Sequence, residues 1–421
     1  MDARHSTASG THPVPLQVGV AGLGFGSTEF LPILERMPMI QLMAAADLRK
    51  HALQAFEKRY GGRTYESAEA LCRDPDVEAV WIATPGELHG EHALLCARYG
   101  KHMVIRKPMA LTVEDCERVL ETAEKTGAKV LAGGQTQGTN PVIAKIRQII
   151  VANELGPLQA MNFWAYTSWM LGPFAQEVDE AQGGGVIWRQ APHQIEAVRW
   201  LGGGLVRSVR AITGRWRPES PQASGYYAAL LEFEDGVSAT LVYNGYGYFD
   251  SVELVSWGQD QGMESRQARR RAFLAGEVDI PQFREAARFG AVVDGEPRVP
   301  WNSLPAERGD RPRYWLPGNQ GVFILTCQAG DIRKSPEGIY IYDDRGKREV
   351  PVPGVYPPGV GMQFLDSEAM ELYDAVRNGT AMLHDGRWGM ATVEVQQAII
   401  ESAKQRREIL LRHQVPVPDG W

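Results

Sequence analysis

The sequence predicts an α/β protein in which a doubly wound parallel sheet precedes an α+β part with an open, largely antiparallel sheet. In the first third of the chain, short apolar runs alternate with helical segments, and a glycine-rich turn follows the first run. After residue 150 the strands alternate between apolar and polar residues. At 421 residues the chain exceeds what one hydrophobic core usually supports. We therefore expect a disordered tail at residues 1–15, a first domain at 16–140 and a second at 141–421.

Composition and charge narrow the functional classes. A net charge of -7 gives no general attraction to nucleic acid or to an anionic membrane. No run approaches the roughly 20 apolar residues of a membrane span, and the polar first residues lack the apolar core of a signal peptide. The four cysteines are scattered without a C-x-x-C pair, which argues against a disulfide framework and a zinc cluster. We expect a cytoplasmic protein that binds no nucleic acid, membrane or metal.

The strands of the first domain are apolar throughout, which is typical of strands covered on both faces in a parallel sheet. They are predicted at LQVGVA, IQLMAAAD, VEAVWIATP, KHMVIRKP and KVLAGGQ. The segments between them, such as STEFLPILERM and TVEDCERVLETAEKTG, place apolar residues at helical spacing. Strands and helices in this alternation predict a doubly wound domain.

The turn after the first strand has the pattern of a dinucleotide-binding loop. It consists of Gly22, Leu23, Gly24, Phe25, Gly26 and Ser27. The first glycine permits a tight turn, and the second lets a pyrophosphate approach the backbone at a helix N-terminus. Asp47 ends the next apolar run, where a ribose-binding carboxylate belongs. The pattern predicts a Rossmann domain that binds NAD. NADP is the second option because Arg49 and Lys50 follow, although a solvated helix start also explains them.

The second part is predicted to form strands at LQAMNFWAYTSW, LVRSVRAITGRW and YYAALLEFEDGVSATLVYNGYGY, after a helix at NPVIAKIRQIIVANELG. Asp235-Gly236 favours a hairpin turn. The segments DSEAMELYDAVRNG and GRWGMATVEVQQAIIESAKQRREILL predict amphipathic helices that pack back on the body. Residues 246–345 include a basic run, Arg266 with Arg269 to Arg271, which we interpret as a solvated or subunit-contact helix. An arm that supplies an arginine to a bound anion is the alternative.

Two motifs in the first domain give the chain a family resemblance. The stretch IATPGELHGEHALLCARYGKHMVIRKPMALT, with GLGFGS and the glycines at 183, resembles the Gfo/Idh/MocA family of nicotinamide-dependent oxidoreductases. The resemblance implies that the lysine reaches the nicotinamide edge and the substrate hydroxyl, and that the second sheet's open face forms a dimer or tetramer. The implied cofactor contacts are Thr84, Pro85, His89, Lys107 and Pro108. A surface lysine, and a capping or core role for His89 or His92, are the alternatives.

The chain departs from the family pattern at two positions that usually hold a carboxylate. Arg106 precedes Lys107, and Arg189 stands shortly before His193 in GGGVIWRQAPHQIEAVRW. The resemblance implies catalytic roles for Lys107 and His193, and the two arginines suggest an anionic substrate because an arginine fork binds a carboxylate through parallel hydrogen bonds. The expected substrate contacts are Arg106, Arg189, Gln190 and Gln194. Alternatively, strand alternation turns Arg106 away from the site, and His193 belongs to the core.

Three further stretches resemble the phthalate 4,5-cis-dihydrodiol dehydrogenase branch of this family. They are RQAPHQIEAVRWLGGGLVRSVRA, CQAGDIRKSPEGIYIYDD and HDGRWGMATVEVQQAII. The resemblance implies oxidation of phthalate 4,5-cis-dihydrodiol by NAD to 4,5-dihydroxyphthalate, and a dianionic substrate agrees with the two arginines. Two alternatives stay open. One is a sugar, glycoside or inositol oxidoreductase, or an NAD-dependent glycosidase, of the same family, and the other is a non-catalytic NAD-binding protein.

Overall fold

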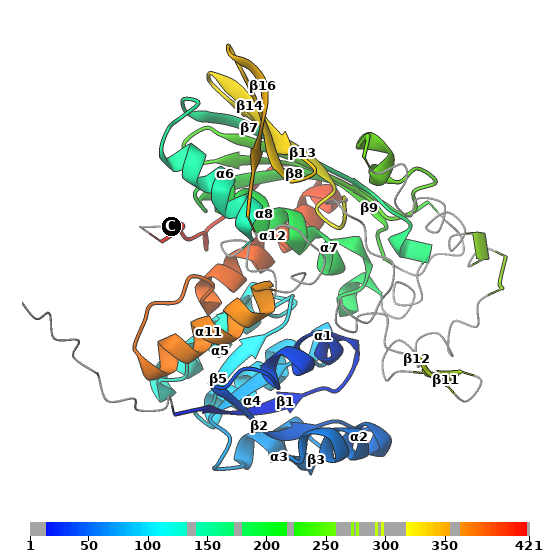
Figure 1. Ribbon diagram of the computed structural model, residues 1–421, viewed down its shortest axis with the longest axis vertical. Coiled ribbons are helices and arrows are strands. Elements are labelled where there is room, and N and C mark those ends of the chain that lie inside the picture. The colour runs from blue at the N-terminus through cyan, green and yellow to red at the C-terminus, as the bar shows by residue number, and fades with distance from the viewer. Residues whose placement is uncertain are drawn as a thin grey trace, which may run out of the picture.

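The computed structural model describes residues 14–132, 140–171, 179–216, 223–257, 271–272, 275–277, 291–293, 296–298, 317–353 and 363–418. Within them the chain forms two large sheets with helices packed between and around them (Figure 1). The predicted tail up to residue 13, and the basic run except for its last arginine, lie outside the described residues. None of the described helices combines the length and the apolar character that crossing a bilayer requires.

The first sheet confirms the predicted doubly wound fold. Its strands are β1 (Leu16–Ala21), β2 (Ile40–Ala46), β3 (Arg63–Tyr65), β4 (Ala79–Ile82), β5 (His102–Ile105) and β6 (Val130–Ala132). All are parallel and run in the order β3-β2-β1-β4-β5-β6. The order reverses between β1 and β4, and ligands bind open α/β sheets at the carboxyl ends of strands at such a reversal.

Helices cover both faces of this sheet, which explains why its strands are apolar throughout. They are α1 (Phe25–Leu34), α2 (Lys50–Tyr60), α3 (Ala68–Arg73), α4 (His89–Arg98), α5 (Val113–Thr126) and α11 (Gln363–Arg377). On one face, α1, α2 and α11 bury Phe30, Phe56 and Leu372. On the other face, α3, α4 and α5 bury residues such as Cys96 and Val119.

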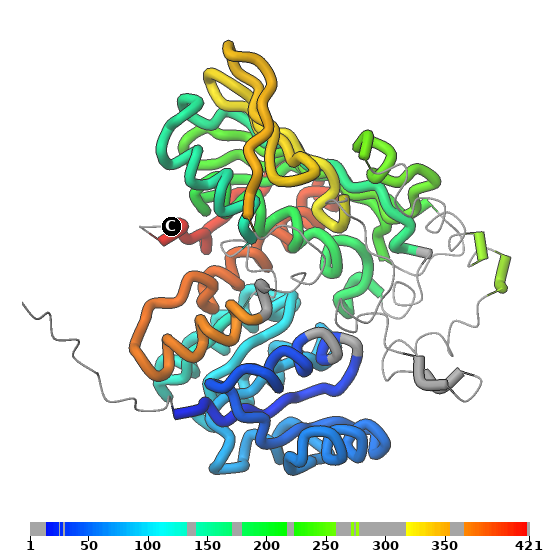
Figure 2. Tube along the Cα trace, viewed as in Figure 1, coloured from blue at the N-terminus to red at the C-terminus, as the bar shows by residue number. Residues whose placement is uncertain are grey.

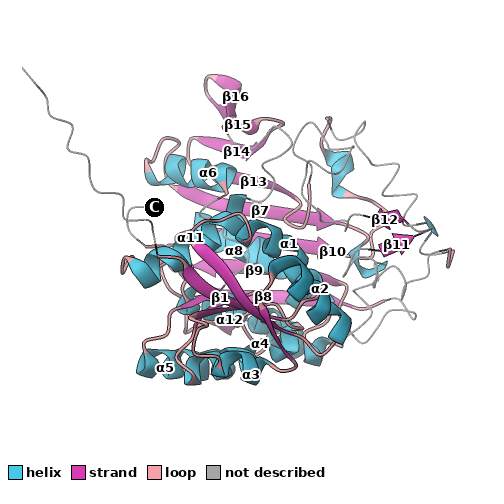
Figure 3. Cartoon of the chain, turned by 60° about the horizontal axis from the view of Figure 1, so that its bottom comes forward, coloured by secondary structure: helices cyan, strands magenta, loops and turns pink. Residues whose placement is uncertain are grey.

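The second sheet is open and mostly antiparallel, as predicted. Its strands are β7 (Leu158–Tyr166), β8 (Val206–Gly214), β9 (Tyr226–Phe233), β10 (Ser238–Asn244), β13 (Val322–Cys327), β14 (Gly330–Lys334), β15 (Gly338–Asp343), β16 (Gly346–Pro351) and β17 (Ile409–Leu410). Their order is β16-β15-β14-β13-β7-β10-β9-β8-β17, and only β7 and β10 pair in parallel among these described strands. Figure 3 shows β16, β15, β14, β13, β7 and β10 side by side in this order. Two short strands, β11 (Ala291–Val293) and β12 (Glu296–Arg298), pair separately.

The C-terminal helices connect the two sheets. The remaining helices of the described residues are α6 (Pro141–Val151), α7 (Gly185–Arg189), α8 (Ala191–Leu201) and α12 (Gly386–Gln405), with short turns η1 (Gly86–Leu88), η3 (Trp169–Leu171), η4 (Glu180–Gln182) and η5 (Ser251–Leu254). On α12, Val393 joins the core of the parallel sheet, whereas Val395 and Ile399 join the core of the second sheet. Figure 2 traces the chain returning from the second sheet through α11 and α12. Because α12 packs into the cores of both sheets, a site between the sheets is supported by both cores.

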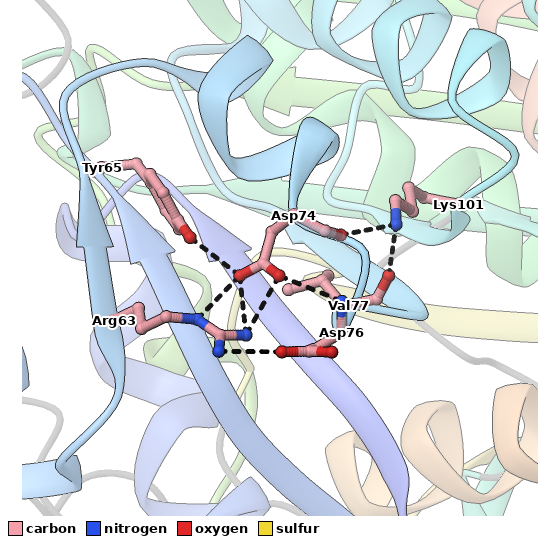
Figure 4. Close-up of polar contacts among 6 residues, drawn as sticks. All are labelled: Arg63, Tyr65, Asp74, Asp76, Val77 and Lys101. Carbon is pink, nitrogen blue, oxygen red and sulfur yellow. Dashed lines mark hydrogen bonds and ion pairs between the residues drawn. The ribbon is translucent and has the colours of Figure 1, made fainter.

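A polar cluster around the buried Asp74 lies beside the edge strand β3 of the parallel sheet (Figure 4). Asp74 is 6% exposed and accepts hydrogen bonds from the Arg63 guanidinium at 2.9 and 3.0 Å and from the Tyr65 hydroxyl at 2.9 Å. Lys101 Nζ donates to the carbonyl oxygens of Asp74 and Val77 at 2.7 and 2.6 Å. The cluster ties β3, the loop before β4 and the turn before β5 together.

Candidate functional site

The glycine turn lies at the carboxyl end of β1, beside the reversal of strand order. Gly22 has φ 95°, and a Cβ built there would lie 2.7 Å from the Thr84 nitrogen, so the turn requires glycine. A Cβ at Gly24 meets no described atom within 4 Å, and Gly24 leads directly into α1. An open glycine backbone that runs into helix amides suits a pyrophosphate. The turn therefore fits the dinucleotide that the sequence predicts.

Asp47 is bonded to this turn. Its carboxylate accepts a hydrogen bond from the Leu23 amide at 2.8 Å and two from the Arg49 guanidinium, both at 2.8 Å. Burial raises the pKa of Asp47, but the hydrogen bonds from Arg49 and Leu23 outweigh burial and lower it. Asp47 is therefore an ionised acceptor at the place where a ribose hydroxyl would bind.

His89 lies between the turn after β4 and the turn after β5. It is 2% exposed, and its ring nitrogens lie 2.6 Å from the Pro108 carbonyl oxygen and 2.8 Å from the Thr84 carbonyl oxygen. Burial lowers the pKa of His89 to about 4. The Thr84 hydroxyl lies 3.0 Å from His92 Nδ1, and Pro85 starts the η1 turn. The geometry therefore shows His89 linking two turns, and its contact with a cofactor stays a prediction.

Lys107 marks the junction of the two parts of the chain. It follows β5 and is joined to Pro108 by a cis peptide bond. Its Nζ donates a hydrogen bond to the carbonyl oxygen of Arg189, the last residue of α7. The carboxyl edge of the parallel sheet and the start of α8 thus meet at this amine.

His193 lies in the first turn of α8 and is 8% exposed. Its Nε2 lies 3.3 Å from Asn319 Nδ2, and because an amide nitrogen only donates, Nε2 accepts. Burial, with the positive charges of Lys107 and Arg106, holds the pKa of His193 well below its usual value. His193 is therefore neutral at physiological pH. Asn319 was missed from sequence because its turn before β13 lies where the chain departs from the family pattern.

The two arginines are placed differently. Arg106 is 9% exposed and pairs with the buried Glu368 of α11, with 3.4 Å between Nη1 and Oε2. Arg189 is more accessible, because its side chain is 29% exposed. Its Nε donates to the Gly183 carbonyl at 2.9 Å, and its Nη2 lies 3.8 Å from Glu87 Oε2. Arg189 therefore presents a partly exposed guanidinium beside the η1 turn.

The structure separates the two glutamines predicted to bind substrate. Gln194 is 0% exposed and donates to the carbonyls of Val242 and Gln320, while it accepts from the Tyr227 hydroxyl. These bonds anchor α8 to the second sheet, and a contact of Gln194 with the substrate stays a prediction. Gln190 is 5% exposed, and its Oε1 accepts no hydrogen bond from the described residues. No group of three or more His, Cys, Asp or Glu residues is arranged to hold a metal within the described parts of the chain.

Comparison with known proteins gives two matching family models. Residues 16–133 match the model described as "Oxidoreductase family, NAD-binding Rossmann fold". Residues 143–259 match the model of the GFO/IDH/MocA C-terminal domain. The first match contains the glycine turn, Asp47 and Lys107, and the second contains Arg189 and His193.

Individual relatives match over most of the chain. The 1-carboxy-3-chloro-3,4-dihydroxycyclohexa-1,5-diene dehydrogenase of Comamonas testosteroni is 30% identical over 397 residues, covering 92% of this chain and 95% of the relative. The 4-carboxy-2-hydroxymuconate-6-semialdehyde dehydrogenase of Sphingobium sp. is 27% identical over 54% of this chain and 71% of the relative. A crystal structure assigned as a dehydrogenase from Bordetella bronchiseptica RB50 is 31% identical, with a TM-score of 0.77 over 94% of this chain and 100% of the other.

Proposed function

Because the chain belongs to the Gfo/Idh/MocA family of NAD-binding oxidoreductases, we propose that it is a dehydrogenase for a carboxylated cyclic cis-diol. Phthalate 4,5-cis-dihydrodiol is the substrate we propose, and 4,5-dihydroxyphthalate is the product. The observation that carries the proposal is the position of the Lys107 amine, which is bonded to the Arg189 carbonyl and lies close enough to His193 to lower its pKa. A relative that is 30% identical is named for a carboxylated cyclohexadiene diol, which supports the same substrate class.

The site residues divide into a dinucleotide group and a substrate group. The glycine turn and Asp47 would hold the pyrophosphate and a ribose of NAD, which, when bound, supplies the acceptor for a hydride. Lys107 and His193 would lie against the reacting hydroxyl. Arg189 would bind the carboxylate, because a partly exposed guanidinium keeps its charge and offers two parallel donors.

Proton removal is assigned to Lys107 and His193 as a pair. Burial and the positive charge of Lys107 lower the pKa of His193, so the two groups lie close enough to act on the same hydroxyl proton. His193 is neutral and can accept a hydrogen bond or a proton at Nε2, where Asn319 now donates. Oxidation of one carbinol carbon gives a hydroxydienone, which rearranges to a catechol. The residues therefore mainly orient the ring and remove a proton.

The proposal is tested by following NADH absorbance with purified protein, NAD and four compounds. The panel is phthalate 4,5-cis-dihydrodiol, a monocarboxylated cis-dihydrodiol, an uncharged cis-dihydrodiol and myo-inositol. We expect turnover of the carboxylated diols, with the dicarboxylate preferred. Turnover confined to myo-inositol or other neutral polyols would instead support the sugar or inositol oxidoreductase alternative. No reduction of NAD by any cyclic diol would contradict the proposal.

A further inference from the structure

The ring of His193 depends on one amide for its orientation. Among the residues that the structure describes, Asn319 is the one that hydrogen-bonds to this ring, with 3.3 Å between Asn319 Nδ2 and His193 Nε2. No described residue bonds to the other ring nitrogen, Nδ1, where a catalytic histidine usually meets a carboxylate or a carbonyl. His193 is 8% exposed, whereas Asn319 is exposed. An exposed side chain therefore controls a buried ring.

The turn that carries Asn319 is fixed to its surroundings through the backbone. Gly321 follows in this turn with φ 71°, and a Cβ there would collide with the Trp164 carbonyl oxygen of β7. Gln194, which follows the histidine in α8, donates to the Gln320 carbonyl at 3.2 Å. The backbone on both sides of the contact is thus held, while the side chain of Asn319 is free to rotate at the surface.

The contact also decides which nitrogen of His193 carries the proton. Burial and the cations Lys107 and Arg106 lower the pKa of His193, so the ring is neutral. A neutral imidazole has one nitrogen with a proton and one with a lone pair. Because Asn319 donates to Nε2, the lone pair is at Nε2 and the proton is at Nδ1. The amide therefore prepares Nε2 to accept.

We propose that Asn319 is a positioning residue that keeps His193 Nε2 as the acceptor and gives up this place to the hydroxyl of the substrate. Nε2 has one lone pair, so the amide and the hydroxyl cannot both donate to it. The side chain of Asn319 turns away when the diol binds, whereas the turn itself stays in place. In the free protein Asn319 therefore occupies the position of the reacting hydroxyl. This inference rests on the place given to His193 under the proposed function.

The partner of the histidine comes from outside the ranges that match the family models. These ranges are 16–133 and 143–259, so they include His193 but not Asn319. The family pattern thus accounts for the histidine and leaves its tautomer to another segment of the chain. A substitution at 319 can change the histidine without changing any matched motif.

The first test reads the tautomer of His193 directly and needs no substrate. Two-bond proton–nitrogen spectra are recorded on histidine-labelled holoprotein with NAD. We expect the proton on Nδ1 in the wild type and on Nε2 in Asn319→Asp, because a carboxylate only accepts hydrogen bonds. The matched control is Gln328→Glu, which makes the same amide-to-carboxylate change at an exposed residue beyond the other end of β13. The control should keep the proton on Nδ1.

A wild-type ring with its proton on Nε2 would overturn the inference. An unchanged ring in Asn319→Asp, or the same change in Gln328→Glu, would overturn it as well. Asn319→Leu provides a second variant, since an apolar side chain neither donates nor accepts. We expect both tautomers of His193 in this variant, and a ring that stays wholly in the Nδ1–H form would show that Asn319 does not set it.

Kinetics with the carboxylated diol separate this inference from the proposed function. We expect Asn319→Leu to lower kcat about 10-fold, because only part of the protein then has Nε2 as acceptor. The KM for the diol should not rise, because the amide no longer competes for Nε2. An unchanged kcat in Asn319→Leu would refute the positioning role alone. Full activity of His193→Asn would refute the role of the histidine in the proposed function. If no cyclic diol is turned over, the proposed function fails and the spectra decide the inference.

Discussion

Among the single residues of the site, His193 illustrates what burial adds to a sequence motif. The motif predicted a histidine near the reacting hydroxyl but could not predict its charge. The structure buries the ring beside Lys107 and Arg106, which lowers its pKa well below the usual value. The charged form would lose its hydration and gain two repulsive neighbours.

We expect His193 to stay neutral throughout pH 5.5 to 8, a range that includes about 6.5, the value of an unperturbed histidine. Two-bond proton–nitrogen spectra of histidine-labelled protein would show a neutral ring with the proton on Nδ1, assigned by comparison with His193→Asn. Because its pKa is lowered, His193 takes up a proton only at a pH below the range in which a histidine usually titrates. A signal that titrates near pH 6.5 would contradict this account.

The two arginines show where single-residue prediction reaches its limit. Their places in the motifs of the resembled family suggested that both Arg106 and Arg189 bind an anion, with an Arg106 turned away from the site as the alternative. In the structure Arg106 is buried against Glu368, 262 positions away in sequence, whereas the Arg189 side chain is 29% exposed beside Glu87. The fold alone determines which residue of α11 lies beside the end of β5. The different exposure of the two arginines could therefore not be predicted from the local sequence pattern.

At the scale of elements, the polar cluster of Asp74 shows how loops fix the parallel sheet (Figure 4). Burial raises the pKa of Asp74, but bonds from the Asp76 amide, Tyr65 and Arg63 outweigh it and lower the pKa below 3.8. A carboxyl group whose folded-state pKa is lowered stabilises the fold above its unfolded-state value. That stability is lost as the pH falls through the lowered value.

We expect Asp74→Asn to destabilise the protein by about 2 kcal/mol near pH 7, as for lost hydrogen bonds to a buried charged group. The difference from wild type should shrink as the pH falls below 3.8. Urea unfolding followed by circular dichroism at several pH values measures it. Asp344→Asn, at an exposed hairpin residue, is the control. A pH-independent difference would show that packing and not charge is responsible.

Elements with strong local patterns were predicted well. The first sheet follows from apolar runs between amphipathic helices, and the second from alternating strands. The pairing of the second sheet depends on contacts far apart in sequence. β13 lies beside β7, and the short β17 near the C-terminus pairs with β8. Asn319 reaches His193 only through the first of these pairings, so no sequence signal marked it. The domain boundary at residue 140 stays a prediction.

At the scale of the whole molecule, the outer face of the second sheet suggests an assembly. Large apolar side chains on four of its strands are 36% to 55% exposed, namely Trp164, Ile212, Leu230 and Ile324. The strand register places them in two adjacent rows on one face, because Trp164 and Ile212 share one row and Ile324 and Leu230 share the next. Clustered exposed apolar residues are typical of a subunit interface.

We expect the purified protein to be a dimer or tetramer through this face. Leu230→Lys combined with Ile212→Lys should reduce its mass in light scattering, since a buried charge in the interface is costly. Leu254→Lys, at a residue that is 51% exposed in the η5 turn, serves as the control and should leave the mass unchanged. A monomeric wild-type protein, or an unchanged mass in the double variant, would contradict the expectation.

The whole molecule combines a sheet that matches an NAD-binding family model with a second part that carries Arg189 and His193. We propose that Arg189 selects a carboxylated diol. The most direct measurement is the ratio of kcat/KM for phthalate 4,5-cis-dihydrodiol to that for an uncharged cis-dihydrodiol, in wild type, Arg189→Met and the control Arg118→Met on α5. We predict a ratio lowered about 10- to 100-fold in Arg189→Met only, as expected for lost charge-assisted hydrogen bonds. An unchanged ratio in Arg189→Met would contradict the claim.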